Sequence, residues 1–293
     1  MKKYLIAAGM LGFIIAVCVF SNIGELYALP LQTPAAFLAG MPYMTCNAFG
    51  REFILIQPSS TFFVYLLGVI MMALGAYFLK TRRGEKSRLY LGAGFILWGI
   101  SALAAGTSYQ AFGYELKCRG REYCLFTSNW ELVYMLLAAY CINCVMIAVG
   151  YETLQQKGRQ LIIKFAVIYS LAYSVYMLAG SMIPNRFVIS YEGFIAFIGI
   201  NFVIMFIVNV YQYHVRKDKF NRNMIIIWLA FIVVNAGYFI YLYSGIAAPL
   251  YEHYGIWFNA NDMLHVLLIA WSVLIFFLIR NNTGNAAGRR AAS

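Results

Sequence analysis

The sequence predicts an all-α, multi-pass membrane protein with eight transmembrane helices. Hydrophobic residues make up 62% of the 293 residues, and charged residues make up only 11%. The apolar residues gather in continuous runs of about twenty, the length that a helix needs to cross a hydrocarbon core of about 30 Å. The charged residues lie between these runs. Helices rather than short alternating strands therefore satisfy the backbone in lipid.

The chain divides into four expected regions. Residues 1–22 form an N-terminal anchor helix; a signal peptide is the alternative, but no small-x-small cleavage site follows closely. Residues 23–60 form an outer-face segment that holds four of the six prolines. A seven-helix core follows over 61–280, and residues 281–293 form a disordered cytoplasmic tail. The expected spans are 4–20, 61–80, 89–112, 130–150, 161–182, 191–212, 223–244 and 263–280.

The basic residues set the expected orientation. If the N-terminus is cytoplasmic, 17 of the 22 Lys and Arg residues fall on cytoplasmic segments. This excess recurs in every second loop, which is the positive-inside pattern. We therefore expect a bacterial inner-membrane protein with both termini in the cytoplasm. The same bias accounts for the net charge of +11, so no nucleic-acid partner is expected.

The cysteines predict one disulfide. Cys118 and Cys124 share the short outer loop KCRGREYC, and the outer face of a bacterial membrane is oxidising. The alternatives are two free thiols, or a pairing of Cys46 with either one. Cys141 and Cys144 form a C-x-x-C pair, but their expected depth of about 16 Å favours packing between helices over a thiol relay.

Polar side chains gather at the outer ends of the core helices. Charged groups inside a membrane are costly, so they are candidates for function. Because the polar groups of five helices reach one level just below the outer surface, we expect a pocket that opens outward. The residues expected to line it are Ser108, Tyr109, Gln110, Glu115, Glu131, Glu192, Asn235, Asn261, Asp262 and His265.

Asp262 and His265 begin the last span in the motif NDMLH. Residues at i and i+3 are neighbours on a helix, so the carboxylate can orient the imidazole as a general base. Alternatively, the two side chains bind a metal ion together with Glu115. A third interpretation makes Asp262 a helix-capping residue and His265 a hydrogen-bonding group between helices. Ligand recognition without chemistry is the fourth.

The seven-helix core, the cluster GTSYQ late in its second helix and NDMLH in its last helix resemble the CREST superfamily. This superfamily includes alkaline ceramidases and the progestin and adipoQ receptors. Its hydrolases bind zinc through one histidine in the second core helix and an H-x-x-x-H pair in the last. His265 matches the second histidine of that pair, Asn261 stands at the first, and Tyr109 stands at the position in the second helix. The resemblance implies a shared scaffold and site position.

The sequence therefore suggests hydrolysis of a lipid amide or ester, with Asp262, His265, Ser108, Tyr109 and Glu115 in the catalytic site. Zinc is the cofactor that the resemblance implies. The alternatives are a receptor-like protein that binds a lipid or small ligand, and a structural subunit that docks a partner membrane protein. Membrane lipids are expected partners. No retinal is expected because residues 263–279 hold no lysine, and no haem because the histidines do not face one another.

Overall fold

The computed structural model describes residues 2–48, 50–281 and 283, and it is an all-α membrane protein. Among these residues, seven helices are long and apolar enough to cross a membrane, and α1 adds a shorter apolar stretch, Ala8–Phe20. The tail expected over 281–293 lies almost wholly outside the described residues. The long helices are α1 (Lys2–Phe20), α3 (Pro58–Lys80), α4 (Lys86–Gly106), α6 (Asn129–Thr153), α7 (Gln156–Met182), α8 (Tyr191–Arg216), α9 (Lys219–Ser244) and α11 (Ala260–Ile279).

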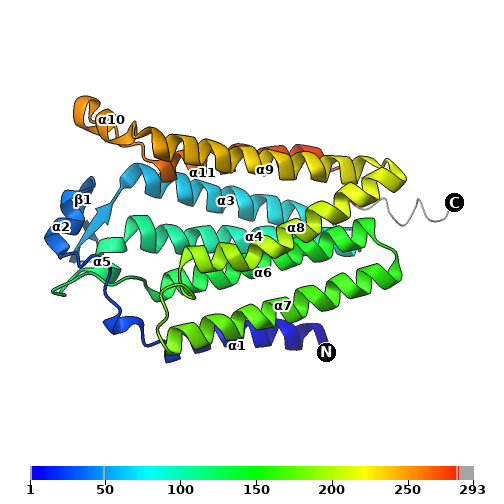
Figure 1. Ribbon diagram of the computed structural model, residues 1–293, viewed down its shortest axis with the longest axis horizontal. Helices are drawn as coiled ribbons and strands as arrows, with labels where there is room; N and C mark the ends of the chain where they lie inside the picture. Colours follow the sequence, from blue (N-terminus) through cyan, green and yellow to red (C-terminus); the bar gives the residue numbers. More distant parts are fainter. Residues whose placement is uncertain (1, 49, 282, 284–293) are drawn as a thin grey trace.

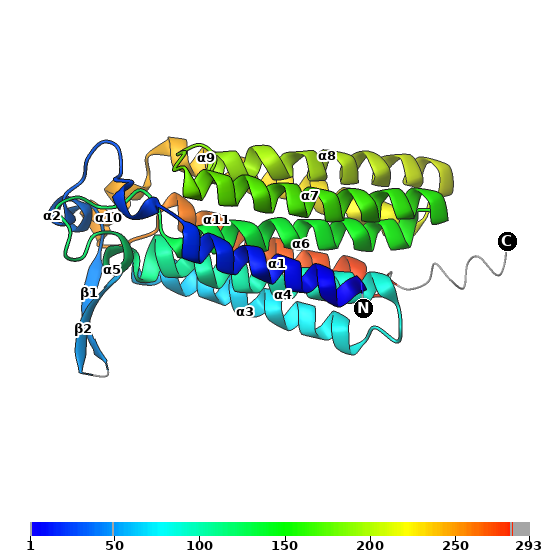
Figure 2. The same ribbon diagram turned by 90° about the horizontal axis from the view of Figure 1, so that it is seen from below.

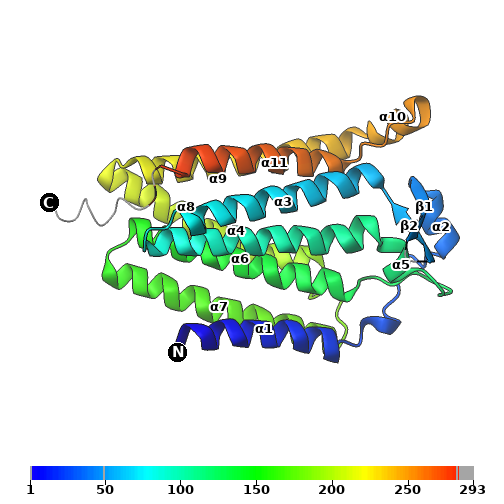
Figure 3. The same ribbon diagram turned by 180° about the vertical axis from the view of Figure 1, so that it is seen from behind.

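The long helices lie side by side as one bundle (Figure 1). The chain-order neighbours α3, α4, α6 and α7 pack one against the next, and α1 lies against α7 and α6. The last helix, α11, packs between α9 and α3, while α8 bridges α9 and α6. The start of α1 and the end of α11 lie at the same end of the bundle (Figure 3). Eight helices in this arrangement agree with the expected spans.

Small residues set the close contact between α3 and α4. A Cβ atom added at Gly99 would lie 2.6 Å from the carbonyl oxygen of Gly68 and 2.5 Å from Cγ of Met72. A backbone carbonyl cannot move aside cheaply, so this contact requires glycine. Close approach through small residues is a common way for helices to associate in lipid, where no hydrophobic effect drives them together.

The end of the bundle opposite the termini carries most of the non-spanning structure, and we call it the hairpin end. The strands β1 (Tyr43–Ala48) and β2 (Arg51–Ile56) form an antiparallel hairpin, which extends sideways from the helices (Figure 2). The sequence predicted only a proline-containing segment here. A turn at Gly50, with a φ of 72°, permits the hairpin. The short helices of this end are α2 (Pro34–Ala39), α5 (Gly113–Lys117) and α10 (Ala247–Tyr254).

Candidate functional site

A buried carboxylate at the start of α6 collects three hydrogen-bond donors. Glu131 accepts from Nζ of Lys117 at 2.9 Å and from Oγ of Ser108 at 2.8 Å, both on Oε1. Its Oε2 accepts from Oγ1 of Thr127 at 2.9 Å. Ser128 lies 2.7 Å from Ser108, hydroxyl to hydroxyl. We call these five residues the Glu131 network, and all of them are buried.

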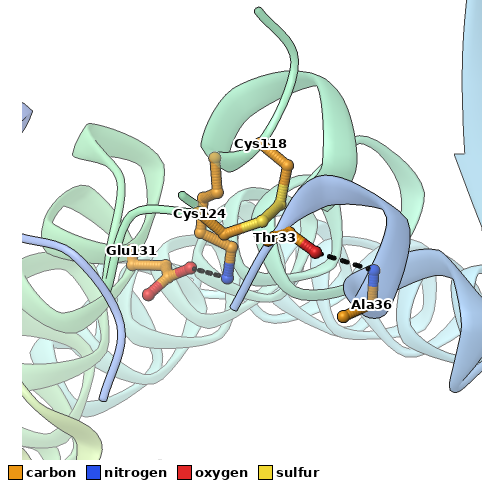
Figure 4. The surroundings of a disulfide bond; sticks show 6 residues. Thr33, Ala36, Cys118, Cys124 and Glu131 are labelled. Atoms are coloured by element: carbon orange, nitrogen blue, oxygen red, sulfur yellow. Dashed lines mark hydrogen bonds and ion pairs between the residues drawn. A yellow bond between two sulfur atoms is a disulfide. The ribbon is translucent and has the colours of Figure 1, made fainter. Parts of the chain in front are cut away.

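Two local features build this network. The helix α4 ends in a π-helical turn over Thr107–Ala111, which carries Ser108; such turns are frequent at functional sites. Lys117 comes directly before Cys118, which forms the predicted disulfide with Cys124. Figure 4 shows Glu131 on one side of this disulfide and α2, with Thr33 and Ala36, on the other. The disulfide therefore closes the loop that directly follows Lys117, the only cation of the network.

A second buried carboxylate lies at the start of α11. Asn259 and Asp262 form a capping box: Oδ1 of Asn259 accepts from the Asp262 amide, and Oδ2 of Asp262 accepts from the Asn259 amide at 2.8 Å. The start of α3 packs against this turn, because Asn259 donates to the Gln57 side chain and Ser59 donates to the Trp257 carbonyl. One carboxylate oxygen of Asp262 thus caps the start of α11, as the capping interpretation expected.

The other oxygen of Asp262 has one neighbour among the described residues, the hydroxyl of Ser60. Asp262 and Ser60 are both 0% exposed. The Ser60 side chain of α3 lies beside the Asp262 carboxylate, yet neither Oγ of Ser60 nor Oδ1 of Asp262 makes a well-formed hydrogen bond. We call Gln57, Ser60, Asn259 and Asp262 the α11 cap.

His265 lies one turn further along α11 and is 9% exposed. Its Nδ1 is 2.7 Å from the carbonyl oxygen of Asn261. A carbonyl can only accept, so Nδ1 carries the proton and Nε2 keeps its lone pair. Within the described chain, Nε2 has no hydrogen-bond partner. Asp262 does not orient the imidazole, so the expected Asp262–His265 dyad is not formed.

Glu115 does not join Asp262 and His265. Its carboxylate accepts from the Ile54 amide of β2 at 2.8 Å and pairs with Arg119 at 2.7 Å. The Ile54 contact holds α5 against the hairpin. The hydrogen bond from Arg119 to the Glu115 carboxylate raises the pKa of the exposed Arg119 guanidinium. In the part of the chain that the structure describes, no three His, Cys, Asp or Glu side chains could together hold a metal ion. The expected three-residue metal set was therefore wrong.

A group of tyrosines lies beside the Glu131 network. The ring of Tyr109 packs edge-to-face against Tyr134, at 6.0 Å between centroids, and Tyr134 contacts Phe194 of α8, which in turn contacts Tyr191. The Tyr109 phenol lies next to Glu131. Among the described residues, the Tyr134 and Tyr191 hydroxyls have no hydrogen-bond partner, and both side chains keep some exposure. We call Tyr109, Tyr134 and Tyr191 the tyrosine group; Glu192, exposed, stands at its edge.

The remaining predicted residues lie apart from a common centre. Gln110 is buried, and its Oε1 lacks a partner. Asn235 donates to the Phe231 carbonyl of its own helix at 2.7 Å. Asn261 supplies the carbonyl that His265 contacts. The predicted residues thus share one end of the bundle, but the interactions divide them into separate groups: no hydrogen bond or ion pair within the described chain joins the Glu131 network to the α11 cap.

Sequence reasoning missed Lys117, Thr127, Ser128 and Ser60. One sequence feature would have found part of this set, since Ser128-x-x-Glu131 is the spacing of a capping box. Lys117 would follow from its place beside a predicted disulfide. No local feature marks Ser60, because its neighbour Asp262 is about two hundred residues away in sequence.

The zinc site implied by the CREST resemblance does not fit the side chains present. Only His265 offers a ligand nitrogen there; Asn261 uses its carbonyl to hold that ring, and Tyr109 packs beside Glu131. One histidine nitrogen does not make a zinc site, because zinc sites in proteins use three or four protein ligands. Comparison of the chain with protein-family models, with curated proteins and with solved structures finds no match in any of the three.

Proposed function

We propose that this chain is a receptor-like membrane protein that binds the polar headgroup of a lipid, or a small polar ligand, at the tyrosine group. The observation that carries this proposal is the pair of Tyr134 and Tyr191 hydroxyls. They are hydrogen-bonding groups with partial exposure and no partner in the described chain. Tyrosines of this kind offer an apolar ring to an acyl chain and a hydroxyl to a headgroup.

The surroundings support binding rather than chemistry. Glu131, the buried carboxylate beside Tyr109, has three donors on it and is not free to act as a base or nucleophile. The Glu131 network also fixes Tyr109, against which Tyr134 packs. A rigid scaffold with unpartnered hydroxyls at its edge lowers the entropic cost of ordering a bound ligand.

Native mass spectrometry of the detergent-purified protein tests this proposal. We expect bound phospholipid on the wild type and at least a fivefold lower occupancy on the double variant Tyr134→Phe/Tyr191→Phe, which removes only two hydroxyls. Tyr211→Phe is the matched control, because Tyr211 is 62% exposed near the far end of α8. Equal lipid occupancy in all three proteins, or none in the wild type, would refute the proposal.

Hydrolysis of a lipid amide or ester is the second candidate, and His265 is the observation that favours it. Its Nε2 is the free nitrogen of a ring that a backbone carbonyl holds in place, as a general base requires. Purified protein should then release fatty acid from a ceramide or a phospholipid, and His265→Ala should abolish the release. Release that is the same in wild type and His265→Ala would exclude this role.

The proposed orientation places the hairpin end outside and both termini in the cytoplasm of a bacterial inner membrane. The distribution of basic residues supports this orientation. The Cys118–Cys124 disulfide at the hairpin end supports it as well, because disulfides persist on the oxidising side of a membrane. Membrane lipids are the proposed partners.

A further inference from the structure

Two cations lie over one tyrosine ring at the end of the bundle that is opposite the hairpin end and close to the start of α1 (Figure 3). Nζ of Lys86, at the start of α4, is 5.6 Å from the centroid of the Tyr151 ring, near the end of α6. Cζ of Arg159, at the start of α7, is 5.2 Å from the same centroid. Three different helices therefore bring two positive charges to one place.

Neither cation takes part in an ion pair or a side-chain hydrogen bond of the described chain. The three ion pairs there use Arg88, Lys117 and Arg119. Glu85 directly precedes Lys86 but pairs with Arg88. A tyrosine ring attracts a cation through its π-electrons, yet it carries no net charge. The ring therefore holds two like charges that repel one another.

The cations are both positioned and accessible. Tyr90 of α4 stacks on Tyr151, with 5.8 Å between the ring centroids and 12° between the ring planes, which fixes the ring beneath the two charges. Lys86 is exposed, and Arg159 keeps partial exposure. Glu152, the residue after Tyr151, is buried. The surface around the ring thus presents N–H donors of one charge sign.

We infer that Lys86 and Arg159 bind a phosphate group between them. The arginine guanidinium offers a planar fork of donors that matches two phosphate oxygens, and the lysine ammonium adds a compact positive charge. An anion placed there also removes the repulsion between the two cations. The headgroup of an anionic phospholipid and a free phosphate ion share this chemistry.

The place of the site favours the lipid as the source of the phosphate. The three helices that supply the side chains are all long and apolar enough to cross a membrane, and the site lies at their ends. Basic pockets between the ends of spanning helices bind lipid headgroups. This phosphate site is at the other end of the bundle from the tyrosine group and does not depend on the proposed function.

Isothermal titration calorimetry of the full chain in a non-ionic detergent tests the inference. The probes are dihexanoyl phosphatidylglycerol, dihexanoyl phosphatidylcholine, which has the same acyl chains and no net charge, and inorganic phosphate. We expect Lys86→Gln/Arg159→Gln to bind phosphatidylglycerol about tenfold more weakly than the wild type, because both charge-assisted contacts are lost. The matched control Arg82→Gln/Arg83→Gln removes two exposed charges near the start of α4 and should leave the affinity within about twofold.

The two phosphate probes identify the source. Binding of phosphatidylglycerol alone would assign the site to a lipid, and binding of inorganic phosphate as well, weakened in the same variant, would show that the phosphate group suffices. If the double variant does not fold, Lys86→Gln at the exposed position carries the test. Equal affinity for phosphatidylcholine, equal losses in the two double variants, or no binding by the wild type would overturn the inference.

Discussion

The two buried carboxylates of the hairpin end start from the same local pattern and reach opposite states. Glu131 is the third residue of α6 after the N-cap residue Ser128, and Asp262 is the third residue of α11 after the N-cap residue Asn259. Asp262 turns back and caps its own helix. Glu131 turns inward instead, and Ser128 makes no side-chain cap.

The difference comes from what lies across from each helix start. Glu131 faces Lys117 and Ser108, whose charge-assisted hydrogen bonds are stronger than a local cap. Asp262 faces only Ser60, so its local cap is the better contact. The comparison teaches that an acidic residue at the third helical position caps its own helix only where no distant side chain offers it a stronger hydrogen bond. One carboxylate is consequently saturated by side-chain donors, and the other has a single hydroxyl beside it.

The largest expected loss of stability follows the removal of Lys117, the cation of the Glu131 network. Lys117→Met should cost about 3–5 kcal/mol, because it leaves the buried Glu131 carboxylate charged and without a counter-charge. Thermal and denaturant unfolding in detergent would measure the loss. The double variant Lys117→Met/Glu131→Gln should recover much of it, since no buried charge remains. A double variant no more stable than the single one would show that the ion pair is not the cause.

Two serine-to-alanine substitutions compare the surroundings of Glu131 and Asp262 directly. Ser108→Ala should cost about 2–3 kcal/mol, because it removes a hydrogen bond to a charged group and leaves Ser128 without its partner. Ser60→Ala should cost less, about 1 kcal/mol, because the Ser60 hydroxyl makes a single, poorly aligned contact with the Asp262 carboxylate. Unfolding midpoints of the two variants would measure the difference. A loss at Ser60 as large as the loss at Ser108 would break the comparison.

The disulfide should contribute to the Glu131 network because Lys117 directly precedes Cys118. The double variant Cys118→Ser/Cys124→Ser should lose about 2 kcal/mol, as expected for a bridge between cysteines six residues apart. Unfolding with and without a reducing agent would measure it, and Cys46→Ser, at a cysteine without a disulfide, is the control. Wild type that is equally stable in both conditions would contradict this expectation.

The smallest effect concerns the cap itself. Asn259→Ala should cost about 1 kcal/mol, because its side chain accepts hydrogen bonds from two backbone amides of the first turn. Asn261→Ala, two residues later, removes a side chain that makes no hydrogen bond within the described chain, and it should change stability little. A comparison of the two midpoints measures the cap. Equal losses would mean that Asn259 does not act as one.

Most of the fold follows from the sequence. Each expected span has a matching helix, because runs of apolar residues between charged loops leave the backbone no other way to satisfy its hydrogen bonds in lipid. The Cys118–Cys124 disulfide was also predicted, from its short loop. The β1–β2 hairpin was not predicted, because the four prolines of residues 23–60 favour turns over strands and a single glycine, Gly50, is a weak signal of a hairpin turn.

The candidate site was predicted as a place and not as an arrangement. Hydrophobic patterning fixes the depth of each polar residue along its own helix, and that is why Ser108, Glu131 and Asp262 share one end of the bundle. Which of them meet depends on how the helices pack around one another, and patterning carries no such information. Only the tertiary structure decided that Lys117 pairs with Glu131 and that Ser60 lies beside Asp262. The reason is that the free energy of a buried charge depends on its neighbours in space, which the sequence of one helix does not specify.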